Sequence, residues 1–162
     1  NYERVSAIKH EDGYIGCAKS HIKCIEIAKM NKYEKVIILE DDFMFVKNNN
    51  FKNIKLPKTF DIFLLCNLVK NSKRIDTYFN RVEYSEWTSG HILNHTIYND
   101  LIKNLNEGIE SRLNEGKNRN NNLDIYWNKL FKDYQCLSHN YIFATQKEGY
   151  SDIKNKNIQR KN

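Results

Sequence analysis

An apolar run that ends on three acids constrains this chain more than any other feature. Val36 to Leu39 are apolar throughout, which is typical of a strand covered on both faces in an α/β sheet. Glu40, Asp41 and Asp42 follow directly. In open α/β sheets, ligands bind in the crevice outside the carboxyl ends of the strands. The pattern therefore predicts a ligand site where a buried strand ends.

The spacing of apolar residues elsewhere predicts alternating helices and strands. Apolar positions three and four apart predict a helix over residues 14–31, and a second buried run predicts a strand over residues 62–68. The order predicts an α/β fold, a wound sheet with helices on both faces. The other expected elements are a short strand at residues 4–8, helices at 98–106 and 123–134, and a last strand at 137–144. One domain is expected over residues 1–153, followed by a basic polar tail at 154–162.

Composition excludes several classes of protein. The chain has 162 residues, of which 40% are hydrophobic, enough to bury a core. No apolar run approaches the ~18 residues of a membrane-spanning helix. The net charge is +6, but the basic residues gather in the tail and in one loop, so no nucleic-acid partner is expected. The four cysteines lack the spacing of a zinc module, and we interpret them as reduced, buried thiols.

The acid cluster has two interpretations. Acids commonly end strands in solvated loops, and this needs no ligand. Three adjacent carboxylates also repel one another, however, and a cation relieves that repulsion. In an extended backbone, Glu40 and Asp42 point to one side and Asp41 to the other. That side suits a hard, oxygen-preferring cation such as Mn²⁺ or Mg²⁺, with water and diphosphate oxygens completing the shell.

Further short motifs accompany the acid cluster in a fixed order. They are Gly16-Cys17-Ala18-Lys19-Ser20-His21, Glu40-Asp41-Asp42, Asp61-Ile62-Phe63-Leu64-Leu65, Thr88-Ser89-Gly90-His91-Ile92-Leu93, Asp124, and Gln146 followed by Gly149, Ser151, Asp152 and Ile153. In this order they resemble glycosyltransferase family 25. That family includes bacterial lipooligosaccharide galactosyltransferases and collagen hydroxylysine galactosyltransferases.

The resemblance implies a GT-A-like fold and a metal-dependent sugar transfer. The donor would be a UDP-sugar, most often of galactose or glucose, and the acceptor a hydroxyl on a glycan, a lipooligosaccharide or hydroxylysine. Carried onto this sequence, Asp42 would bind Mn²⁺ or Mg²⁺ directly, with Glu40 as the second acid of the metal site. Glu40 and Asp41 would also contact ribose or metal-bound water, and Gln146 would belong to the donor site.

Four further residues are candidates for the site, and two of them, Asp124 and His21, also have a structural interpretation. Asp124 is the candidate general base for the acceptor hydroxyl, although an aspartate before a helix is equally often an N-terminal cap. Asp152 is the second candidate for the base, or a residue of the nucleotide site. Ser20 and His21 lie early in a helix, where free N–H groups favour a phosphate. A histidine that faces a sheet is, however, more often part of the core.

One departure from the family leaves two functions open. Family members usually begin with a strand and a downstream arginine that contacts the nucleotide, and nothing here precedes Asn1, so we expect a sheet without its first strand. The chain is then either an enzyme or a catalytically inactive binding domain or fragment. A glycoside hydrolase with two carboxylates and a nucleic-acid-binding protein are less favoured, because neither explains the ordered motifs.

Overall fold

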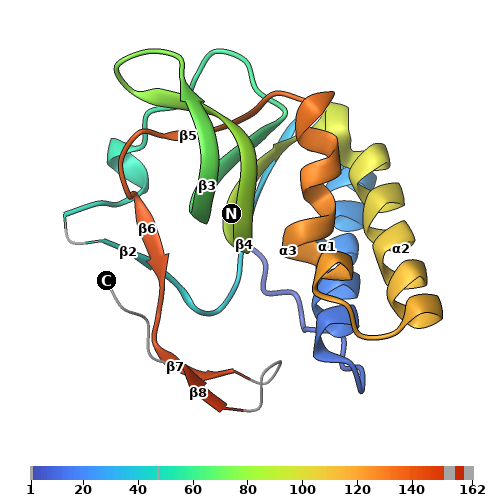
Figure 1. Ribbon diagram of the computed structural model, residues 1–162. Helices are drawn as coiled ribbons and strands as arrows, with labels where there is room; N and C mark the ends of the chain where they lie inside the picture. The colour runs from blue at the N-terminus through green and yellow to red at the C-terminus, as the bar shows by residue number, and fades with distance from the viewer. Residues whose placement is uncertain (1, 47, 152–155, 159–162) are drawn as a thin grey trace.

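The computed structural model describes residues 2–46, 48–151 and 156–158, and it contains both helices and strands (Figure 1). The α/β class expected from the sequence is confirmed. The α-helices are α1 (Gly13–Met30), α2 (Tyr98–Glu115) and α3 (Leu123–Tyr126). The strands are β1 (Lys35–Leu39), β2 (Phe43–Phe45), β3 (Ile62–Arg74), β4 (Phe79–Asn94), β5 (Cys136–His139), β6 (Ala144–Gln146), β7 (Gly149–Ser151) and β8 (Lys156–Ile158). The 3₁₀ turns are η1 (Phe51–Asn53), η2 (His95–Ile97), η3 (Arg119–Asn121) and η4 (Trp127–Lys132).

The main sheet has the strand order β1-β4-β3-β5. Strand β4 is antiparallel to β1 and β3, and β3 is parallel to β5. The sequence analysis singled out residues 88–93 as a motif but did not predict β4 as a strand. Over much of β4 the buried side chains recur every third residue rather than alternating, because bulges shift its register against β3.

All three α-helices lie on one face of the sheet, on the right in Figure 1. The core there combines Ile25 of α1, Leu101 of α2 and Trp127 with Ile62 and Leu93 of the sheet. The expectation of helices on both faces is wrong in this respect. The segment between β1 and β3 lacks the apolar spacing of a long helix, and it supplies strand β2 instead.

The β2–β6 ribbon and a group of aromatic side chains cover the opposite face. Strand β2 pairs with β6 in antiparallel register. Phe63 and Phe143 are fully buried on this face, and the rings of Phe45 and Phe143 meet edge to face with centroids 5.6 Å apart. Aromatic packing therefore replaces a second helical layer.

The first half of the chain departs from expectation in two places. Residues 4–8 were predicted as a strand, but they form an irregular segment along α1, where Ile8 N donates to Ser20 Oγ at 2.8 Å. A strand needs backbone partners, and this hydrogen bond goes to a helix side chain. Strand β1 was expected to be covered on both faces, yet Ile37 is 46% and Leu39 41% exposed, because β1 is an edge strand of the sheet.

The last part of the chain is divided more finely than expected. The strand predicted over residues 137–144 is broken into the end of β5 and the start of β6. Asp152 and most of the predicted tail at 154–162 lie outside the described residues. No described helix is both long enough and apolar enough to span a membrane.

Candidate functional site

The carboxyl end of β1 is fixed to β4 by backbone hydrogen bonds. Glu40 N donates to Ser89 O at 2.8 Å, which extends the pairing of the two strands by one residue. Phe43 N then donates to Glu40 O at 3.1 Å, so the chain turns through the acids instead of continuing as the extended backbone that the sequence analysis expected. The turn leaves Asp41 exposed and Asp42 half-buried.

The Glu40 carboxylate is the centre of a hydrogen-bond network. Oε1 accepts from Thr88 Oγ1 at 2.7 Å and from His21 Nε2 at 3.1 Å, and Oε2 accepts from Ser89 Oγ at 3.4 Å. Burial by itself would raise the pKa of Glu40, but the hydrogen bond and charge of His21 and the hydrogen bond from Thr88 outweigh burial and lower it to about 2. Glu40 is therefore ionised at neutral pH and held from three sides.

Two histidines connect this network to the core. The rings of His21 and His91 stack with centroids 5.4 Å apart, and His91 meets Trp127 at 5.3 Å. Burial, together with the charge of His21, lowers the pKa of His91 to about 3. His91 is thus neutral, and its Nδ1 lies 3.1 Å from Thr88 O, which only accepts. His91 therefore donates to Thr88 O and fixes the residue that donates to Glu40.

Gln146 reaches the site from the far end of the sequence. The register of β2 and β6 places Gln146 opposite Phe43, and Lys147 N donates to Asp42 O at 2.6 Å. The Gln146 amide nitrogen donates to Ser89 Oγ. Its Oε1 atom is buried and has no hydrogen-bond partner among the described residues. The closing glutamine of the predicted motif order therefore lies beside the acid cluster.

Cys17 of α1 is a half-buried thiol whose pKa responds to the acids of the site. Burial raises the pKa of the Cys17 thiol well above its usual range, and the charges of Glu40, Asp124 and Asp42 raise it further. Of these acids, Glu40 has a carboxylate oxygen within 4.8 Å of Cys17 Sγ. The sequence analysis assigned roles to all three acids but none to Cys17.

A bulge in β4 holds Asp124. Between Gly90 and Glu86, three residues of β4 lie opposite a single residue of β3, and within this stretch Trp87 has a φ of 67°, a rare conformation for a bulky residue. Trp87 N donates to Asp124 Oδ2 at 3.3 Å. Asn122, not Asp124, is the N-cap residue of α3. Burial raises the pKa of Asp124, and the charges of Glu86 and Glu40 act in the same direction.

Asn128 ties the bulge to the helical layer, and the sequence analysis missed it. Its Oδ1 accepts from Ser85 N at 2.8 Å, and its Nδ2 donates to Ser85 O at 2.9 Å. Asn128 follows Asp124 by four residues, so one helical face bonds the backbone at both Ser85 and Trp87. That i, i+4 spacing of two polar residues is the signal that could have identified it.

Comparison with known families shows to which family the chain belongs. The family model of glycosyltransferase family 25 (LPS biosynthesis protein) matches residues 6–114, about two thirds of the chain. The chain belongs to glycosyltransferase family 25. Among curated proteins, none matches it. As a family 25 member it is a glycosyltransferase with a sugar donor and an acceptor, and the GT-A-like α/β fold implied by the resemblance is confirmed.

The matched region divides the predicted site residues. Ser20, His21 and the three acids lie within residues 6–114, whereas Asp124 and Gln146 lie beyond it. Ser20 does not face the acids through its hydroxyl, because Oγ donates to Gly16 O and accepts from Ile8 N, both at 2.8 Å. Its hydroxyl holds the N-terminal segment on α1, whereas His21 reaches Glu40.

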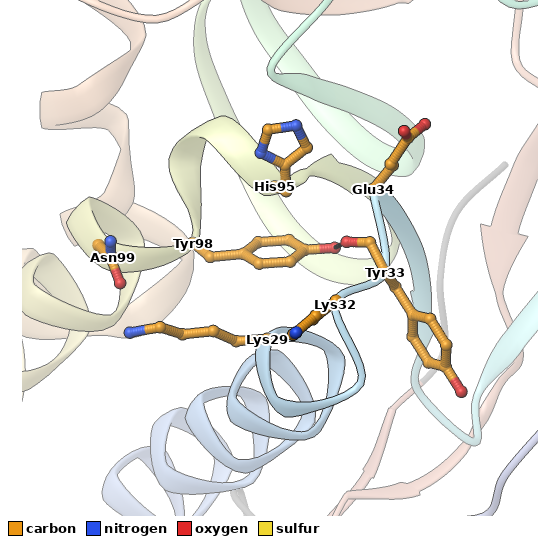
Figure 2. Close-up of a pocket in the computed structure, with 7 residues that line it drawn as sticks. All are labelled: Lys29, Lys32, Tyr33, Glu34, His95, Tyr98 and Asn99. Atoms are coloured by element: carbon orange, nitrogen blue, oxygen red, sulfur yellow. Dashed lines mark hydrogen bonds between the residues drawn. The ribbon is translucent and has the colours of Figure 1, made fainter.

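A separate open pocket of about 350 Å³ lies at the other end of β1 (Figure 2). There Tyr98 donates its hydroxyl to Tyr33 O at 3.1 Å. The pocket lies before the start of β1, and Glu40 follows the end of β1. The two regions therefore lie at opposite ends of this strand. None of the predicted site residues lines the pocket. Its lining residues are Lys29, Lys32, Tyr33, Glu34, His95, Tyr98 and Asn99.

Proposed function

We propose that this family 25 glycosyltransferase transfers galactose or glucose from a UDP-sugar to a hydroxyl of a glycan, a lipooligosaccharide or hydroxylysine. The observation that carries the proposal is the convergence of Glu40 and Asp124 on adjacent residues of β4: Glu40 accepts from Thr88 Oγ1 at 2.7 Å, and Asp124 accepts from Trp87 N at 3.3 Å. Sugar transfer needs carboxylates in two roles, for the leaving diphosphate and for the acceptor hydroxyl. The convergence supplies both in one place.

The residues present fit a hard divalent cation, Mn²⁺ or Mg²⁺. Asp42 offers a half-buried carboxylate. Its backbone oxygen accepts from Lys147 N, the residue after Gln146, and the buried Gln146 Oε1 atom has no hydrogen-bond partner among the described residues. Glu40 Oε2 has one long hydrogen bond, 3.4 Å from Ser89. Such oxygens are the ligands these ions prefer. Asp42 and Glu40 would hold the ion, which when bound supplies positive charge to the leaving diphosphate.

The chain's own residues prepare the donor side. His21, Thr88 and Ser89 fix the Glu40 carboxylate before any ligand binds, so little order is lost on binding. Asp41 is exposed at the turn, where we place a contact to ribose. His21 acts here by holding Glu40 in place. We place the donor phosphates on the side of Glu40 that His21 occupies.

Asp124 is the proposed base on the acceptor side. Its raised pKa, caused mainly by burial, makes it a better proton acceptor than an ordinary aspartate. The Trp87 N–H orients one carboxylate oxygen. Asp124 would take the proton from the acceptor hydroxyl as that oxygen attacks the anomeric carbon and the diphosphate leaves.

A donor screen with one acid variant tests the proposal. We expect the chain to release UDP from UDP-galactose or UDP-glucose in the presence of Mn²⁺ and to stop when a chelator is added. Asp42→Asn should lower the rate at least about 100-fold, whereas Asp133→Asn, at an exposed position, should leave it unchanged. Metal-dependent UDP binding without turnover for any acceptor would instead identify an inactive binding domain.

A further inference from the structure

Three residues at the junction of α1 and β1 place different ligand atoms together. The Sγ of Cys17, a ring nitrogen of His21 and a carboxylate oxygen of Glu40 lie within 4.8 Å of one another. We propose that these three side chains form a second metal site, which binds a borderline cation such as Zn²⁺. This site goes beyond the sugar-transfer proposal and does not depend on it.

The backbone places the three ligands on converging sides. Cys17 and His21 are four residues apart in α1, so they share one helical face, the spacing by which two helical residues bind one ion. Glu40 reaches them from the end of β1, with His21 Nε2 3.1 Å from Oε1. In tetrahedral zinc sites, bond lengths of about 2.0–2.3 Å put ligand atoms about 3.5 Å apart. Small side-chain rotations therefore suffice to admit the ion.

The donor set selects a different class of metal from the oxygen site. A thiolate, an imidazole and a carboxylate suit Zn²⁺ or Co²⁺ better than Mn²⁺ or Mg²⁺. Three protein ligands also leave a fourth position for water, as in the open zinc sites of enzymes rather than the closed sites of structural zinc. His21 is buried, while Cys17 and Glu40 are half-buried, so an ion can enter from solvent.

Hydrogen bonds that orient metal ligands are already present. Thr88 and Ser89 donate to the two oxygens of Glu40, and Gln146 in turn donates to Ser89. Such outer partners fix the direction of a ligating carboxylate and raise metal affinity. When the ion binds, the direct hydrogen bond between His21 and Glu40 is exchanged for two metal–ligand bonds.

The surrounding charge also favours a cation. Asp42 and Asp124 add negative charge to that of Glu40 around Cys17. The Cys17 thiol loses its proton to solvent as Sγ binds the ion, so binding strengthens as pH rises. Because Glu40 belongs to both metal sites, Zn²⁺ at the Cys17 site competes with the donor metal and should inhibit sugar transfer.

Cobalt binding to the whole chain tests the site without any nucleotide. Titration with Co²⁺ should give a thiolate-to-metal absorption band that saturates at one Co²⁺ per chain. Zn²⁺ should abolish the band by displacing Co²⁺. Cys17→Ser should lose the band, and His21→Gln should weaken binding at least about 10-fold. Cys24→Ser changes the other half-buried cysteine of α1. This variant should keep both the absorption band and the affinity for Co²⁺. Absence of the band, or its loss in Cys24→Ser alone, would overturn the proposal.

A second measurement needs no variant. Alkylation of Cys17 in the unchanged chain, followed by peptide mass spectrometry, should slow at least about 10-fold with Zn²⁺ and not with Mg²⁺. Equal rates with both metals would count against the site. UDP release with Mn²⁺ on the same sample separates the two proposals, since sugar transfer without a cobalt band rejects only the second metal site.

Discussion

His21 Nε2 lies 3.1 Å from Glu40 Oε1 and joins the third turn of α1 to the end of the edge strand β1. The pair is largely shielded, with the His21 side chain 7% and the Glu40 side chain 25% exposed. Through Thr88 and Ser89 the same carboxylate also reaches β4. A helix and two strands therefore meet at one ionised group, and the acid cluster cannot move independently of them.

Replacing the histidine of this pair should destabilise the fold. His21→Leu leaves a buried carboxylate without one of its partners, which should lower the free energy of unfolding by about 1–3 kcal/mol. Urea denaturation at pH 7 measures the change. His95→Leu, at an exposed position, serves as the control and should change stability by less than about 0.5 kcal/mol. Equal effects of the two variants would show that the pair contributes nothing specific.

Removing the amide of Asn128 should affect both the bulge and the reaction. Asn128→Ala removes the side chain that bonds both the N–H and the C=O of Ser85, which is fully buried. The substitution should lower the free energy of unfolding by about 1–3 kcal/mol. The Ser85 amide should then exchange its hydrogen faster, as NMR can measure. Because Ser85 lies two residues before Trp87, whose N–H orients Asp124, the loosened bulge should lower kcat more than it raises KM. Asn106→Ala, on the exposed side of α2, should change neither, and an unaltered kcat in Asn128→Ala would argue against Asp124 as the base.

Two arginines offer a matched comparison of buried and exposed ion pairs. Arg112 donates to Asp12 at 2.7 Å with its side chain 6% exposed, and Arg119 donates to Glu86 at the same distance but is 69% exposed. Arg112→Met leaves Asp12, the N-cap residue of α1, without its buried partner and should cost about 3–5 kcal/mol. Arg119→Met should cost less than about 1 kcal/mol. Thermal or urea unfolding measures both, and similar costs would contradict the importance of burial.

His139 should make stability depend on pH in a defined window. Burial lowers its pKa from 6.5 to about 4, so the unfolded chain binds a proton more readily than the folded one. The stability that the neutral His139 ring contributes is fully present above pH 6.5 and decreases as the pH falls toward 4. His139→Phe should remove this part of the slope, because the ring lies among the rings of Phe63, Phe79 and Phe143. Unfolding free energies between pH 7 and pH 4 measure it, and an unchanged slope would contradict the assignment.

Elements with a local pattern were predictable from the sequence. The spacing of apolar residues identified α1 and the start of α2, and the apolar run identified β1. The ordered motifs identified the family, which the match over residues 6–114 confirms. These features depend on neighbouring residues or on a fixed order, and the sequence contains both.

Features that depend on distant partners were not predictable. The sequence analysis did not predict strand β4, because a bulge at Trp87 breaks the alternation of buried and exposed residues along it. The segment at residues 4–8 was predicted as a strand because its residues alternate weakly between apolar and polar, but strand formation depends on a neighbouring backbone. The sequence analysis gave Cys17 no role as a metal ligand, because its potential co-ligand Glu40 lies in another element.

The sequence by itself determined which residues are candidates for the site: the acids that end β1, the Gly16–His21 motif and Gln146 are specified by residue type and order. Only the tertiary structure decided what each one faces. Glu40 turns to His21 and Thr88, and Gln146 returns to Ser89 from a distant strand. Local sequence sets local conformation, whereas contacts between side chains arise from the packing of elements that are far apart in the chain.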